Sequence, residues 1–475
     1  MVVALDGTAL TVVQPALQRD LDASFTQVQW TSTGYLIAVA SLLVFAGRLG
    51  DRYGHRRVFA VGTLGFAAAS AGVGLASGVG WVIALRVTQG IFGALLQPAT
   101  LGMLRAAFPP ERLGMPIALR TSAIGLSAAA GPVLGGALAT QLGWRSVFYL
   151  SVVPALLIGV LALVVRVPAA RNREGTPPGL DPAGAGLLAV TLACLVHTLV
   201  AVPEQGWTGT TSAGLLAAVV AGGAFVRHER RAASPLVPPR LLRSTAVGPA
   251  LGILVAASAA MFGALFVGTY FLQDVLELDP LRCALWALPL AVLMVVSAPL
   301  SAVLLRRQGP RRTITAAMAV LTLGVLALSR LDEASGPLAT GGGFALLGAG
   351  FGTVMVAATA VVVRHAPVAD AGVAGGLQQT AMNVGPTVGI AVATTSMTAL
   401  APRTGERGPQ WPDSAFLSAM PPTLTTLAVV AALGALAATR LPRWNAARPE
   451  RAAPGDQGPG GTSRLPRGAG PSSPA

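Results

Sequence analysis

Long apolar runs, separated by short segments that carry most of the charge, dominate this sequence. Runs of about 17–27 residues are long enough to cross a hydrocarbon core of about 30 Å as helices. We count fourteen such runs, which predicts an all-α polytopic membrane protein with 14 transmembrane helices. Their approximate ranges are 1–17, 28–47, 57–77, 80–104, 114–139, 145–165, 183–203, 209–227, 245–270, 283–305, 312–330, 337–363, 371–399 and 415–438.

The first run, residues 1–17, is unusual in two ways. It contains one acid, Asp6, and it reaches only about 25 Å at about 1.5 Å per residue. A carboxylate inside a span costs about 2.5–3.5 kcal/mol on insertion scales and is functional by default. We expect either that the start of the chain has been placed too late or that this helix is unusually short.

The arginines predict the orientation. One set of alternate loops holds nineteen arginines, before six more in the tail, and the opposite loops hold six. The basic loops should be cytoplasmic, which puts both termini inside the bacterial inner membrane. Arg120 lies near the cytoplasmic end of run 114–139, from which it can snorkel to the interface, whereas Arg86 falls within run 80–104 and needs an anion.

Composition narrows the function. The chain is 53% hydrophobic and 11% charged, and its net charge of +14 is what cationic cytoplasmic loops produce, so we expect no nucleic-acid partner. All 33 basic residues are arginine, so a P-loop lysine and a Schiff-base lysine are absent from the sequence. With no clustered metal ligands and no GxSxG nucleophile either, we expect neither an enzyme nor a metal or cofactor site.

The chain also repeats itself. DRYGHRR at 51–57 matches RRQGPRR at 306–312, and GPVLGG at 131 matches GPTVGI at 385, with offsets near 255. Five such matches in the same order indicate a duplication in which matched helices keep their orientation. The predicted units are a six-helix bundle (1–166), two inserted helices with linkers (167–243), a second six-helix bundle (244–440) and a disordered tail (441–475).

Several motifs fit this architecture. GRLGDRYGHRR (47–57), LRVTQGIFGALLQPAT (85–100), GLSAAAGPVLGGAL (125–138), LDGTALTVVQPAL (5–17) and GWRSVFYLSVVP (143–154) resemble motifs of the major facilitator superfamily. The combination resembles its fourteen-helix drug:proton antiporters over roughly residues 1–440. The resemblance implies a major facilitator fold of two parallel-repeat bundles plus two inserted helices.

The resemblance also implies roles for particular residues. Asp6 would lie on the central cavity and take part in proton coupling, with Arg86 as its partner. The alternatives are that Asp6 caps a helix at the interface and that Arg86 forms a structural salt bridge or is satisfied by backbone carbonyls. The loop between the second and third helices would act as a conformational switch through Gly47, Gly50, Asp51, Arg52, Gly54 and Arg56. That loop could instead serve only to set topology.

The fifth-helix antiporter motif comprises Gly125, Gly131, Pro132, Gly135 and Gly136. Its implied role is a bend that discourages leak; ordinary small-residue packing is the alternative. Polar and aromatic residues that could line a substrate cavity are Trp30, Tyr35, Gln97, Gln378, Gln379 and Asn383. Helix–helix hydrogen bonding is an equally good interpretation of each. Runs 245–270 to 415–438 hold no acid.

The leading hypothesis is a monomeric, proton-coupled exporter of lipophilic drugs or antibiotics, lipophilic monocations among them. Its partners are then a small lipophilic substrate, protons and the lipid bilayer. A dedicated exporter of one endogenous metabolite or self-made antibiotic is the alternative. A transporter-like membrane sensor is a more remote one, because the sequence predicts no added soluble domain.

Overall fold

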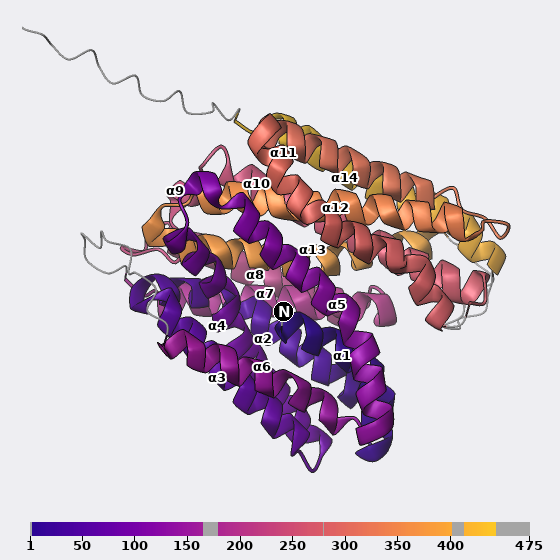
Figure 1. Ribbon diagram of the computed structural model, residues 1–475, viewed down its shortest axis with the longest axis horizontal. Coiled ribbons are helices and arrows are strands. Elements are labelled where there is room, and N and C mark those ends of the chain that lie inside the picture. Colours follow the sequence, from indigo (N-terminus) through magenta and orange to yellow (C-terminus); the bar gives the residue numbers. More distant parts are fainter. Residues whose placement is uncertain (1, 165–178, 279, 401–412, 443–475) are drawn as a thin grey trace, which may run out of the picture.

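The computed structural model describes residues 2–164, 179–278, 280–400 and 413–442, and the regular structure of these residues is helical throughout. The N-terminal helices, indigo to purple in Figure 1, form one bundle, and the orange and yellow C-terminal helices form a second bundle against it. All of the predicted tail except Leu441 and Pro442 lies outside the described residues.

Six long helices build the N-terminal bundle: α1 (Val2–Asp20), α2 (Phe25–Tyr53), α3 (His55–Gly74), α4 (Val79–Ala107), α5 (Gly114–Leu142) and α6 (Arg145–Val164). A short 3-10 helix (Pro110–Arg112) precedes α5. Helices α7 (Pro182–Gln205) and α8 (Gly209–Glu229) follow, and the short α9 (Pro239–Leu242) leads into the second bundle.

The C-terminal bundle comprises α10 (Val247–Tyr270), α11 (Pro280–Leu328), α12 (Pro337–His365), α13 (Ala371–Leu400) and α14 (Asp413–Thr439). A π-helical turn (Phe271–Val275) extends α10, and a 3-10 turn (Val368–Asp370) leads into α13. The predicted helices 283–305 and 312–330 run together as α11, but Gly309 breaks the helix with φ 77°. Helix α11 therefore contains both of these predicted apolar segments, joined at Gly309.

Eleven helices in the described part are long and apolar enough to cross a membrane. This set counts α11 once and includes neither α1 nor α13. The polytopic all-helical fold is thus confirmed, whereas the count of fourteen spans stays a prediction.

The two bundles use the same helix pairs. In the first, α1 packs on α5, α2 and α3 pack on α4, and α3 packs on α6. In the second, α10 packs on α13, and α11 packs on both α12 and α14. The turns at Gly54 and Gly309, which are 255 residues apart, both have positive φ (95° and 77°), a conformation that glycine adopts without steric cost. The duplication read from the sequence therefore has a structural counterpart.

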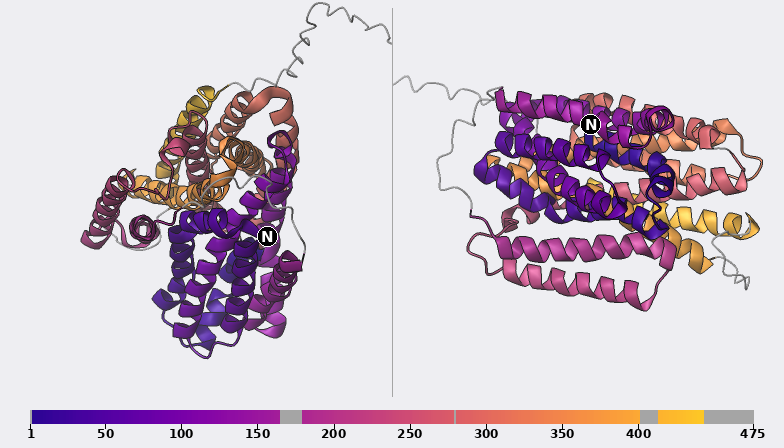
Figure 2. Two further views of the ribbon diagram at one scale, coloured as in Figure 1. Left: turned by 90° about the vertical axis from the view of Figure 1, so that its left-hand side faces the viewer. Right: turned by 90° about the horizontal axis from the view of Figure 1, so that it is seen from below.

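Helices α7 and α8 lie side by side at the edge of the molecule, as the right panel of Figure 2 shows. α7 contacts α2 of the first bundle and α13 of the second. Trp30 of α2 stacks on His197 of α7 with ring centroids 5.7 Å apart, and Leu199 and Val202 pack against Ala391. The inserted pair is thus docked on both bundles.

Candidate functional site

Asp6 of α1 and Arg86 of α4 form a buried ion pair in the N-terminal bundle. The Nη1 atom of Arg86 lies 2.6 Å from Oδ2 of Asp6, and the two side chains are each 1% exposed. Taking two charges out of water is costly unless both are paired and hydrogen-bonded. Each residue of the pair supplies the counter-charge that the other needs when it is buried.

Further polar groups surround the pair. Gln89, one helical turn beyond Arg86, accepts from Arg86 Nη1 (2.5 Å) and donates to Asp6 Oδ1 (3.0 Å) and to Ser70 Oγ (2.7 Å). Arg86 Nε donates to the carbonyl of Thr31 at 3.1 Å. The i, i+3 spacing of Arg86 and Gln89 puts both on one face of α4. Sequence reasoning missed Gln89 and Ser70, although this spacing within LRVTQG was a usable signal for Gln89.

Tyr35 of α2 joins this network to the central cavity. The guanidinium carbon of Arg86 lies 4.5 Å from the centre of the Tyr35 ring, a cation–π contact. The same tyrosine lines a cavity of about 820 Å³ between the two bundles. A change in the charge of the Asp6–Arg86 pair can therefore reach the cavity wall through a single side chain.

The cavity is lined by both bundles. Val2, Val3 and Ala4, at the start of α1 near the centre of Figure 1, contribute to its wall. Four of the predicted substrate residues, Tyr35, Gln97, Gln379 and Asn383, also line it. The space is within the range of known ligand pockets.

Asp6 was expected on the central cavity, but it is buried in its ion pair with Arg86 and does not line the cavity. Two of the predicted substrate residues do not line it either. Trp30 stacks on His197 instead and is 39% exposed. Gln378 is fully buried, and within the part of the chain that the structure describes its amide atoms have no hydrogen-bond partner. Consecutive helix positions point about 100° apart, so Gln378 faces away from the cavity that its neighbour Gln379 lines.

Arg120 corrects another expectation. It does not snorkel to the membrane interface but lines the central cavity, where its Nη2 donates to Oε1 of Gln379 at 3.4 Å. The sequence placed Arg120 correctly on the fifth helix, but it could not show that the helix turns this position toward the second bundle.

At the arginine-rich end, Asp51 joins the two bundles. Its carboxylate accepts hydrogen bonds from the backbone N–H groups of Gly372 (2.7 Å) and Val373 (3.0 Å), in the first turn of α13. A helix N-terminus carries unpaired N–H groups and partial positive charge, so a carboxylate stabilises it. Gly47 of α2 lies against the backbone of Gly372, and a Cβ at either glycine would collide with the other helix.

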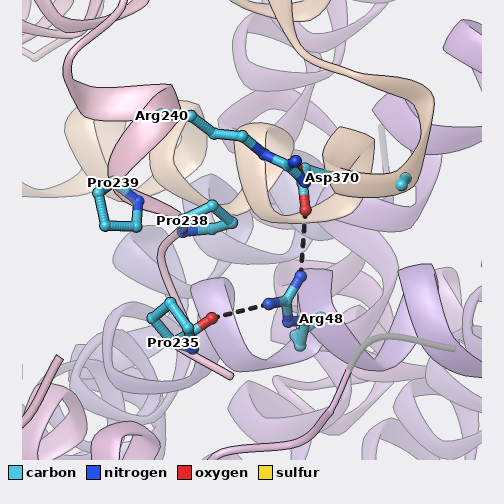
Figure 3. Close-up of a pocket in the computed structure, with 7 residues that line it drawn as sticks. Arg48, Pro235, Pro238, Pro239, Arg240 and Asp370 are labelled. Atoms are coloured by element: carbon cyan, nitrogen blue, oxygen red, sulfur yellow. Dashed lines mark hydrogen bonds and ion pairs between the residues drawn. The ribbon is translucent and has the colours of Figure 1, made fainter. Parts of the chain in front are cut away.

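Beside Asp51, a second acid links three segments of the chain. Asp370 accepts from Arg48 of α2 (3.2 Å) and from Arg240 of α9 (2.6 Å), and Figure 3 shows the two arginines on either side of it. Arg48 also donates to the carbonyl of Pro235 at 2.7 Å. Arg48, Asp51, Arg240, Asp370, Gly372 and Val373 are called the latch below. Sequence reasoning missed Arg48, Arg240 and Asp370 as latch members, because they are far apart in the chain.

The other predicted switch residues make contacts within the first bundle. Gly50 lies under the ring of His55, and Gly54 forms the turn between α2 and α3. Arg52 lies over the ring of Tyr53, and Arg56 donates to the carbonyl of Leu163 at 3.4 Å. Within this motif, Gly47, Arg48 and Asp51 contact residues of the second bundle.

The glycines of the antiporter motif allow close packing of α5. A Cβ at Gly131 would collide with Thr8, and one at Gly135 would lie 2.9 Å from the Cβ of Ala9 in α1. The equivalent Gly385 and Gly389 of α13 pack in the same way on α10. Gly125 faces Met294 of α11, whereas Gly136 has an ordinary contact with Val12. The side chain of Pro132 lies outside the described set.

Two similar helical bundles around a central cavity, with a buried ion pair beside it, define a secondary membrane transporter. The chain belongs to the Major Facilitator Superfamily, whose sequence profile matches residues 1–390. Within the described residues no group of three His, Cys, Asp or Glu side chains could hold a metal ion.

Relatives of known name are bacterial export proteins. The chain is 42% identical over 393 residues to the tetracenomycin C resistance and export protein of Streptomyces glaucescens, covering 82% of this chain and 73% of that protein. It is 33% identical to the probable actinorhodin transporter of Streptomyces coelicolor (82% and 69% covered). It is 29% identical to the multidrug efflux pump LfrA of Mycolicibacterium smegmatis (84% and 79% covered).

A solved structure shows the same fold. The crystal structure of the human organic anion transporter MFSD10 superposes with a TM-score of 0.63 at 16% identity, covering 92% of this chain and 97% of that one. Together the comparisons identify a polytopic membrane protein with a transport role rather than an enzymatic one. Its bacterial relatives place such a protein in the cytoplasmic membrane.

Proposed function

We propose that this chain exports lipophilic drugs or antibiotics across the bacterial cytoplasmic membrane in exchange for protons, working as a monomer with Asp6 as the proton carrier. The observation that carries this proposal is the buried Asp6–Arg86 pair, which Tyr35 connects to the central cavity. Asp6 is 2% exposed and is the acid of this network, so a proton that enters has a defined acceptor.

Protonation of Asp6 would change the balance of the pair. A neutral carboxyl attracts Arg86 less strongly, and a buried charge that loses its partner costs about 3–5 kcal/mol. Gln89 and Thr31 still accept from Arg86, so the guanidinium stays partly satisfied and the cost is reduced. The part of this free-energy cost that Gln89 and Thr31 do not offset can shift the equilibrium between two arrangements of the bundles.

The latch supplies the other element of an alternating-access cycle. We place the arginine-rich end, and with it both termini, in the cytoplasm. The latch then holds the bundles together on the cytoplasmic side, and its opening would admit substrate from the cell. Protonation of Asp6 from outside would favour this opening, and deprotonation to the cytoplasm would favour closing.

The cavity wall favours a range of substrates over one dedicated compound. Four methionines contribute to it: Met261, Met294, Met355 and Met382. Methionine is flexible and polarisable, so a wall rich in it adapts to ligands of different shape. The relatives include proteins named for one antibiotic and others named as multidrug pumps, and a broad exporter is the function that this cavity supports better.

Inverted membrane vesicles that contain the protein test the proposal. An imposed proton gradient should drive uptake of several lipophilic compounds, and a protonophore should abolish it. Vesicles with Asp6→Asn should lose this uptake, while Asp22→Asn, which changes an exposed acid after α1 whose φ is 46°, should retain it. Gradient-independent uptake by the wild type would contradict proton coupling.

A further inference from the structure

The charge inside the central cavity is unexpected for an exporter of cations. Of the described residues that line it, Arg120 is the charged one, and none is an aspartate or glutamate. The polar groups that share the wall with it include Gln97, Gln379 and Asn383. The cavity surface is thus apolar with one fixed positive charge.

Arg120 has no acidic partner in the part of the chain that the structure describes. Its contact there is a long hydrogen bond of 3.4 Å to the amide oxygen of Gln379. By contrast, the buried Arg86 is paired with Asp6, and the buried Arg48 is paired with Asp370. A guanidinium in a membrane-embedded site requires an anion, and its planar set of donors suits a carboxylate, a sulfonate or an ionised phenol.

Asp6, the acid of the buried ion pair, does not fill this role. Asp6 is held by Arg86 and Gln89 and does not line the cavity. The proposed proton carrier, Asp6, and the cavity cation, Arg120, are therefore different residues. An anionic substrate at Arg120 and a proton at Asp6 can then bind without competing for one group.

We infer that Arg120 is the anchor for the acidic group of an anionic aromatic substrate. The remainder of the wall suits such a molecule: the aromatic rings are Tyr35, Phe59, Phe66, Phe262 and Phe351, and the four methionines named above add sulfur contacts. This inference rests on the proposed export function and names its substrate class. It replaces lipophilic monocations with lipophilic monoanions.

The charge of the substrate has an electrical consequence. Export of a monoanion in exchange for one entering proton moves two charges in the same electrical sense. Exchange of a monocation for one proton moves none. Transport of the anion should therefore respond to membrane potential as well as to the pH gradient, whereas a neutral compound in the same cavity should respond less.

Two fluorescent probes that share one aromatic ring system test whether Arg120 selects anionic substrates. Anilinonaphthalene sulfonate is anionic, and phenylnaphthylamine is the same body without the sulfonate. Transport of each is measured in proteoliposomes of the purified protein, with a pH gradient and with a potential set by potassium and valinomycin. The variants are Arg120→Gln and Arg120→Lys, with Arg330→Gln, at an exposed site, as the matched control.

The wild type and Arg330→Gln should transport the anionic probe in preference to the neutral one, with potential dependence. Arg120→Gln should lower the anionic-to-neutral ratio by about ten-fold, as expected for a lost charge-assisted contact. Arg120→Lys, which keeps the charge but not the planar fork, should retain part of the ratio. An unchanged ratio in Arg120→Gln, or a wild type that moves only the neutral probe, would overturn the inference and leave the export function standing. If neither probe responds to the gradient, both proposals fail.

Discussion

The carboxylate of Asp51 caps the helix that begins at Gly372 in the opposite bundle: Oδ1 accepts from the Gly372 N–H at 2.7 Å. The Asp51 side chain is 0% exposed, so this contact is shielded from water and salt. An acid of one bundle therefore satisfies the N-terminus of a helix in the other. The bundles can separate at this end only if those N–H groups find other acceptors.

Replacing Asp51 with Asn should shift the equilibrium toward separated bundles at the arginine-rich end. Asn keeps one acceptor, but it removes the charge that favours the helix N-terminus and turns an NH₂ group toward the second N–H. Hydrogen bonds to charged groups contribute about 1.5–3 kcal/mol, so the closed population should fall about ten-fold or more. Spin labels at the exposed positions Tyr53 and Val368 report the distance between the bundles.

The labels require a background without the two native cysteines, Cys194 and Cys283. A distance distribution identical to that of the unmodified latch would show that Asp51 does not hold the bundles together.

A methyl group at Gly47 should prevent the latch from closing. A Cβ there would collide with the backbone carbonyl of Gly372, and backbone atoms on two packed helices cannot move aside as a flexible side chain can. We expect Gly47→Ala to widen the separation between the same labels and to reduce transport. Gly252→Ala is the matched control, since nothing lies within 4 Å of a Cβ at that position. Equal behaviour of the two variants would exclude close packing as the reason for this glycine.

The two arginines that contact Asp370 should differ in their effect on stability. Arg240 is 65% exposed, and an exposed ion pair contributes about 0–1 kcal/mol. Arg48 is 5% exposed and also donates to the carbonyl of Pro235, so its removal takes the donor from Asp370 Oδ1 and from that carbonyl, at a cost of about 1–3 kcal/mol for each acceptor left unsatisfied. Thermal unfolding in detergent should therefore show a much lower transition temperature for Arg48→Ala than for Arg240→Ala. The reverse order would mean that α9, rather than α2, supplies the essential contact.

Hydropathy was sufficient to predict the helical architecture, and matched segments such as DRYGHRR (51–57) and RRQGPRR (306–312) were sufficient to predict its repeat. The fourteen apolar runs correspond to helices α1–α8 and α10–α14, with α11 containing two of them, and fourteen membrane spans stay a prediction. Motif resemblance brought Asp6 and Arg86 together as candidate partners, and they lie 2.6 Å apart. These features were accessible because each depends on local composition or on a short motif.

Other features depend on contacts between distant segments. Asp370 binds Arg48 and Arg240, which lie 322 and 130 positions before it in the sequence. No local sequence pattern predicts contacts between residues so far apart. The rotation of a helix about its axis is equally hidden, because α5 and α13 show no strong amphipathic stripe. This is why Arg120 was expected at the interface, although it lines the cavity, and why Gln378 was expected in the cavity together with Gln379, although Gln379 lines it and Gln378 does not.

Proton movement driven by substrate tests the central claim most directly. Purified protein is reconstituted into proteoliposomes that contain a pH-sensitive dye, and a gradient of a transported compound is imposed with no pH gradient. The wild type should move protons against the substrate flow, and Asp6→Asn should move substrate down its gradient with no accompanying proton flux. Substrate-driven proton flux in Asp6→Asn equal to that of the wild type would contradict the account.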